Sequence, residues 1–198
     1  MPLVQTTAPT NTVVSLAEAK EHCRVVATDT THDTLLARLI VAASEMIEAR
    51  TGLKLTARTY RLDMDGFPSG DIELPVYPVN SVASVIYSDS ENSSVTMTED
   101  AGSPVGDYWV NTSGVEPYIR AVAGAWPATY LDKPNSVQVT MNAGYSDPSD
   151  CPEDLRAAVL VKVKEMFDNG GETIEGTSAE AAINSVEYLV APHRRYNA

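Results

Sequence analysis

The stretch that decides the fold spans residues 33–52 and reads DTLLARLIVAASEMIEARTG. Its apolar side chains recur every three or four residues, a spacing that places them on one side of an α-helix. They are Leu35, Leu36, Leu39, Ile40, Ala43, Met46 and Ile47. Glu45 and Glu48 lie off this stripe, and Gly52 stands where helices often end in a left-handed residue. We therefore predict a helix that buries the apolar stripe and ends at Gly52.

Two further helices are predicted, one on each side in the sequence. Ser15 and Glu18 have the spacing of a capping box, so a short helix should run from Ser15 to about Arg24. A third helix, over residues 151–169, should have Ser149 or Asp150 as its cap and Pro152 in its first turn. Its apolar stripe consists of Leu155, Ala158, Val159, Val163, Met166 and Phe167.

Residues 53–145 have a different character, with short alternating runs separated by Pro and Gly. Strands are expected at 59–65, 71–74, 82–87, 95–98, 108–111, 119–122 and 137–142. Close spacing and turn residues favour an antiparallel meander or a small barrel. The predicted fold class is thus α+β: a small helical bundle with an inserted β region.

The expected organisation follows from these patterns. Residues 1–14 lack periodicity and should form an extended N-terminal arm. Residues 15–170 should form one α+β domain, with helices in 15–52, the β insert in 53–145 and the last helix in 151–169. Residues 171–198 should be a flexible linker, rich in Gly and Glu, followed by a tail.

Composition restricts the function. The chain has 198 residues, with 14 Lys and Arg against 27 Asp and Glu, a formal net charge of −13. An acid excess of this size opposes tight wrapping of a phosphate backbone. Neither a signal peptide nor an apolar run long enough for a membrane span is found. Cys23 and Cys151 are isolated, so we expect incidental thiols in a cytosolic protein.

Candidate catalytic and metal groups have simpler explanations. Asp63 and Asp65 fit a strand in which both face solvent. The acidic group at 147–154 fits a capped helix start, although it could hold a cation. His22 and His32 flank a loop with no third ligand in evidence, and no nucleotide or hydrolase motif occurs. We therefore predict no catalytic residue, no metal and no cofactor. Trp109 and Trp126 are expected to pack in the core or an interface.

The end of the chain contrasts with the acidic remainder. An apolar segment is followed by basic and aromatic residues, a composition typical of docking peptides. The predicted docking residues are Val186, Tyr188, Leu189, Pro192, His193, Arg194, Arg195 and Tyr196. The alternative is a tail that is disordered or folded back onto its own domain.

The order of these parts resembles the head–tail connector, or adaptor, family of long-tailed bacteriophages and gene transfer agents. The residues that carry the resemblance are VSLAEAK (14–20), EARTG (48–52), LDMDGFP (62–68), IELP (72–75), PVNSV (78–82), WP (126–127), NAGY (142–145), CPEDLRAAV (151–159) and LVAP (189–192). The resemblance covers about residues 15–196. The Gly144-Tyr145 pair followed by the Pro152 helix is the most typical piece.

The resemblance implies a structural protein of a virion or phage-like particle, assembled in the bacterial cytoplasm, and not an enzyme. About twelve copies would form a ring by heterologous contacts. The ring would lie beneath the portal at the neck, extend the DNA channel without sequence-specific binding, and present a surface to the next neck, stopper or tail protein. The docking tail, residues 183–196, would reach the portal. The alternatives are a stopper or tail-terminating neck protein, or a metal-assisted acidic enzyme.

Overall fold

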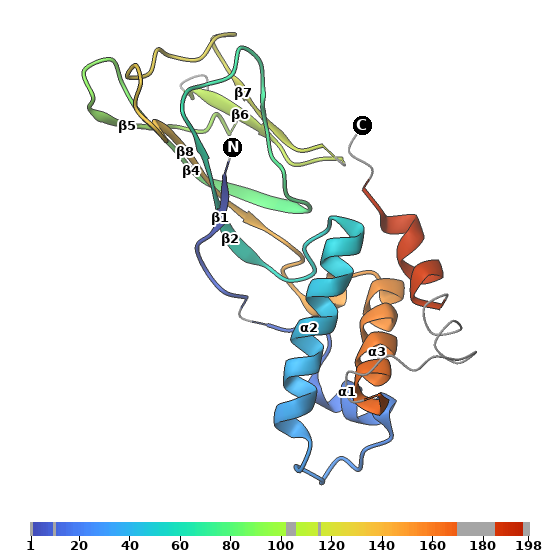
Figure 1. Ribbon diagram of the computed structural model, residues 1–198. Coiled ribbons are helices and arrows are strands. Elements are labelled where there is room, and N and C mark those ends of the chain that lie inside the picture. Colours follow the sequence, from blue (N-terminus) through green and yellow to red (C-terminus); the bar gives the residue numbers. More distant parts are fainter. Residues whose placement is uncertain (1, 10, 102–105, 115, 170–184, 196–198) are drawn as a thin grey trace. The chain divides into compact units, whose positions relative to one another are not determined.

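The computed structural model describes residues 2–9, 11–101, 106–114, 116–169 and 185–195 (Figure 1). It combines helices with antiparallel sheets, so the predicted α+β class is correct. The chain forms two compact units. Unit 1 contains residues 1–10 and 57–144, and unit 2 contains residues 11–56 and 145–198. The single domain expected over residues 15–170 is thus divided between two units, with the division close to the ends of the predicted β insert.

Unit 2 is built on three helices that pack on one another: α1 (Leu16–Cys23), α2 (Asp33–Thr51) and α3 (Glu153–Asp168). The capping box at the start of α1 is present, because Ser15 and Glu18 satisfy each other's backbone amides. Gly52 ends α2 with φ +74° and donates its amide to the Glu48 carbonyl. The predicted ends of these two helices are confirmed.

Three details of the helices differ from the prediction. Leu35 and Met46 are 47% and 37% exposed, because the apolar stripe of α2 is wider than the face its neighbours cover. Glu48 is buried, and its carboxylate accepts a hydrogen bond from the Leu55 amide at 3.0 Å. This bond fixes the segment that follows α2. Pro152 was predicted in the first turn of the last helix but immediately precedes α3, and no side chain caps the start of this helix.

Unit 1 holds a five-stranded antiparallel sheet in the order β1-β2-β8-β4-β5. The strands are β1 (Leu3–Gln5), β2 (Arg58–Met64), β4 (Val79–Ser88), β5 (Ser94–Met97) and β8 (Val137–Ala143). A second sheet, in the order β3-β7-β6, contains β3 (Ile72–Glu73), β6 (Tyr108–Asn111) and β7 (Tyr118–Ala121). One cluster of buried side chains from both sheets forms the core of the unit.

Strand β1 lies within the arm that was expected to precede the fold. It pairs with β2, with Val4 opposite Arg61. The Asp63 amide donates to the Pro2 carbonyl at 3.1 Å. The prediction that Asp63 faces solvent is wrong: its side chain is 4% exposed and bonds to Arg61 at 2.8 Å, because the pairing strand and the guanidinium cover it. Asp65 is exposed as expected.

Candidate functional site

The described part of the tail lies in unit 2. Residues 185–190 are helical and lead into a 3-10 turn, η2 (Ala191–His193). Val186 and Val190 are 1% and 0% exposed. The i, i+4 spacing puts both valines on one side of the short helix, so that side is the one packed on the unit.

Polar contacts tie the end of the tail to the same unit. His193 Nε2 contacts Asp154 Oδ2 near the start of α3. Within the tail itself, Arg194 donates to Glu187 at 2.8 Å. The Arg195 amide donates to the Thr51 carbonyl at 2.9 Å, at the end of α2. A Cβ on Gly52 would lie 3.5 Å from that of Arg195. The backbone of the tail therefore runs against the C-terminus of α2.

The predicted docking residues that the structure describes divide into three groups by exposure. Val186 faces inward, whereas Tyr188 is 80% exposed and Pro192 is also exposed. Leu189 and the basic side chains of His193, Arg194 and Arg195 are half-buried. Tyr196 lies outside the described residues. In this structure the tail is folded back on its own unit and presents Tyr188 and Pro192 to solvent.

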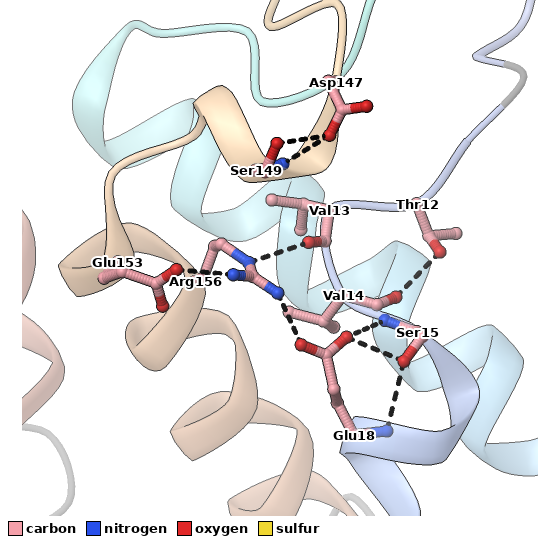
Figure 2. A network of polar contacts seen from close by, with 9 residues as sticks. All are labelled: Thr12, Val13, Val14, Ser15, Glu18, Asp147, Ser149, Glu153 and Arg156. Carbon is pink, nitrogen blue, oxygen red and sulfur yellow. Dashed lines mark hydrogen bonds and ion pairs between the residues drawn. The ribbon is translucent and has the colours of Figure 1, made fainter.

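A network centred on Arg156 holds the helices that carry the tail (Figure 2). The guanidinium donates to Glu153 at 2.6 Å, to the Val13 carbonyl at 3.4 Å and to Glu18 of the capping box. It thereby joins the segment before α1 to the first turn of α3. Hydrogen bonds from Ser15 are the largest cause of a pKa of Glu18 below its ordinary value, and Arg156 adds to them.

The acidic group near α3 is explained by local partners. Asp147 accepts from the Ser149 amide at 2.8 Å and caps the turn η1 (Pro148–Asp150). The predicted cap of the last helix by Ser149 or Asp150 is wrong, because α3 begins after Pro152 and has no side-chain cap. Bonds from Ser149 hold the pKa of Asp147 below its ordinary value. Within the described ranges, no three His, Cys, Asp or Glu side chains gather as a metal site.

The histidines and thiols of unit 2 have separate surroundings. His32 packs edge-on against Phe167, with ring centroids 5.4 Å apart, whereas His22 lines a shallow hollow beside Lys164. Cys23 and Cys151 are both free and buried. Burial raises the pKa of the Cys151 thiol to about 12, so it stays protonated and unreactive at neutral pH.

The aromatic residues of unit 1 are mostly packed. Phe67 stacks on Trp126 at 4.8 Å, and the Trp126 indole donates to the Gly70 carbonyl at 2.7 Å. Trp109 remains 45% exposed on β6. Arg120, opposite it on β7, is held by Asp71 through contacts as short as 2.6 Å. No helix among the described residues has the length and apolarity needed to cross a membrane.

The fold is that of neck components of phage-like particles. The chain is similar to one in the virion of a native gene transfer agent particle, with a TM-score of 0.81 and 22% identity. It is also similar to chains in the neck of the empty particle computed with C6 symmetry (TM-score 0.79, 22% identity) and of the native particle computed with C12 symmetry (0.74, 21%). Each match covers 100% of this chain and 97% of the other.

Residues 13–122 match the family model described as "Phage gp6-like head-tail connector protein". The chain belongs to this family of head–tail connectors, and the resemblance found in the sequence is confirmed. A search of curated proteins finds no match.

Proposed function

We propose that this chain is the adaptor at the neck of a phage or phage-like particle. About twelve copies form a ring beneath the portal, extend the DNA channel and give the next neck or tail protein a surface to bind. Membership of the head–tail connector family carries the proposal. Similarity to a neck chain in a particle computed with C12 symmetry supports the copy number.

Charge supports a channel that DNA passes without being held. Unit 1 carries four Lys and Arg but eleven Asp and Glu. Arg61 and Arg120 are already paired with Asp63 and Asp71. Few cations of this unit are therefore available to bind phosphates, and the surplus acids repel a phosphate backbone.

An exposed face of α2 provides a surface for contact between copies. A shallow groove along it is lined by Ala37, Val41 and Ala42, with Asp33, Arg38 and Glu45 around the apolar centre. Val41 is 49% exposed. An apolar centre with a charged rim is the composition of a protein interface. We assign this groove to the neighbouring copy in the ring.

The tail is the segment assigned to the portal, and its present attachment is weak enough to be exchanged. Burial of each valine contributes about 1.5–3 kcal/mol. The contact of His193 with Asp154 is partly exposed and contributes at most about 1 kcal/mol. The ion pair of Arg194 with Glu187 lies within the tail and does not hold it to α2 or α3. Ordering the tail offsets part of this gain. Contact with a portal can therefore replace the contacts with α2 and α3.

A disulfide tests the role of the tail. The Gly52 and Arg195 Cβ positions are 3.5 Å apart, within the range of a disulfide. Gly52→Cys/Arg195→Cys, oxidised, should hold the tail in place and block stacking on portal rings seen by electron microscopy. The same protein after reduction should stack, and it serves as the matched control for the strain of a side chain at φ +74°.

A chain truncated after Ala182 completes the test. Loss of stacking would agree with a docking tail, whereas stacking by the truncated and oxidised chains would keep the adaptor and reject the tail. If no form associates with the portal but the intact chain binds the tail-side neck protein, the chain is a stopper or terminator.

A further inference from the structure

The N-terminal arm is attached to its unit in an unusual way. Every residue from 2 to 9 is exposed, including Leu3 at 37% and Val4 at 41%. No side chain of the arm is buried, so side-chain packing does not fix the arm to the sheet of its own chain. Figure 1 shows β1 along the edge of the sheet, beside β2.

Backbone pairing and a few polar bonds hold the arm in place. The Thr6 amide donates to the Thr59 carbonyl at 2.9 Å, and the Thr59 amide donates to Thr7 Oγ1 at 3.0 Å. The Gln5 side-chain carbonyl accepts from Arg58 at 3.5 Å. A copy of the same segment from another chain can make every one of these bonds equally well, because each bond joins the arm to β2.

The path of the chain favours such an exchange. After residue 10 the chain leaves unit 1 for the 46 residues 11–56, and it returns at Ala57. Ala8 precedes Pro9, and a residue before proline is kept extended. The chain therefore cannot turn back tightly beside β1.

We infer that in the ring β1 of each copy pairs with β2 of the neighbouring copy. This inference rests on the proposed ring, which places identical chains side by side. Donating and accepting surfaces differ, so the contact is heterologous and repeats around a closed ring, as domain swapping permits. The exchanged β1 is still the edge strand of the sheet, and Leu3 and Val4, exposed in the single chain, then lie at the contact between two copies.

Two single-cysteine variants distinguish the arrangements. The register that places Gln5 opposite Tyr60 also places Thr6 opposite Thr59, and paired strand residues are about 5.5 Å apart at Cα, a distance that a disulfide spans. Thr6→Cys and Thr59→Cys chains are mixed, assembled, oxidised and run on a non-reducing gel. A bond between the two chains forms only if the arm is exchanged. Random mixing should put up to about half of the chains in covalent dimers.

Each variant alone is the control and should give no dimer, since Cys23 and Cys151 are buried. The double variant Thr6→Cys/Thr59→Cys should give a ladder of linked chains. Rings that contain only internally bridged monomers would overturn the exchange while keeping the ring. Exchanged dimers without rings would keep the exchange and reject the ring. Monomers that neither form rings nor link would reject both.

Discussion

The two ends of the chain are attached by opposite means. The tail uses side chains: two buried valines and the contact of His193 with Asp154 of α3. The arm uses backbone bonds to β2, and its side chains are exposed. Side-chain packing depends on particular residues and is lost by substitution. Backbone pairing depends on an extended chain alone, so it tolerates substitution and accepts a copy from another molecule.

The largest effect should come from Val190→Asp. A carboxylate in this fully buried position has no partner, and the cost exceeds what holds the tail in place. We expect proteolysis within residues 185–195 to accelerate at least tenfold while the helices of unit 2 stay folded. Tyr188→Asp, on the exposed side of the same short helix, is the control. Equal protection in both variants would contradict the side-chain attachment.

Arg156→Met tests the contacts that join α3 to α1 and to the segment before it. The variant removes three donors and leaves Glu18 and the Val13 carbonyl without them. The free energy of unfolding should fall by about 1–3 kcal/mol, measured with urea. Arg50→Met, an exposed position on α2, should change it by less than about 0.5 kcal/mol. The bonds between Thr6 and Thr59 should keep their protection from hydrogen exchange.

Low pH should destabilise unit 2 because it protonates Glu18. Its pKa is lowered in the folded chain, so the stabilisation is present above its ordinary pKa of about 4.5 and is lost as pH falls through the lower folded value. The free energy of unfolding of the wild type should decline below about pH 4.5. In Glu18→Gln this part of the decline should be absent. An identical pH profile in the two proteins would refute the assignment.

Salt should affect the attachment of the tail but not that of the arm, and the effect should be smaller than those of the substitutions above. The contact of His193 with Asp154 joins the tail to α3 at the surface and is screened by salt when the imidazole is protonated, whereas residues 2–9 carry no charged side chain. Between 0.05 and 0.5 M NaCl (concentrations chosen to bracket a Debye length of about 10 Å), amide exchange at Arg195 should rise a few-fold. Exchange at Thr6 should stay constant, and a parallel rise at both amides would count against the contrast.

The smallest effect should follow Leu3→Ser. Leu3 is exposed in the single chain, so the free energy of unfolding of the monomer should change by less than about 0.5 kcal/mol. If the arm is exchanged, the same change should weaken ring formation measured by analytical ultracentrifugation. A monomer destabilised by more than about 1 kcal/mol would show that Leu3 packs within its own chain.

Local patterns predicted the elements well where one rule applies. Alternation and turn residues located β6 at Tyr108–Asn111 without error, and the capping box located the start of α1. Burial of charged residues was predicted poorly. Glu48 and Asp63 look like surface residues in sequence, but both are buried, and the Leu55 amide and the Arg61 guanidinium satisfy their carboxylates. Arg156 was missed because two of its partners, Glu18 and Val13, lie 138 and 143 residues away.

The sequence by itself determined the α+β class, the capping box of α1, the end of α2 at Gly52 and the family, because periodicity, caps and the order of motifs are local properties of the chain. Only the tertiary structure decided that the tail lies on α2 and α3 and that the arm completes a sheet edge. Both attachments join residues far apart in sequence. Their stability depends on surfaces formed only when the units fold, and no local pattern records them.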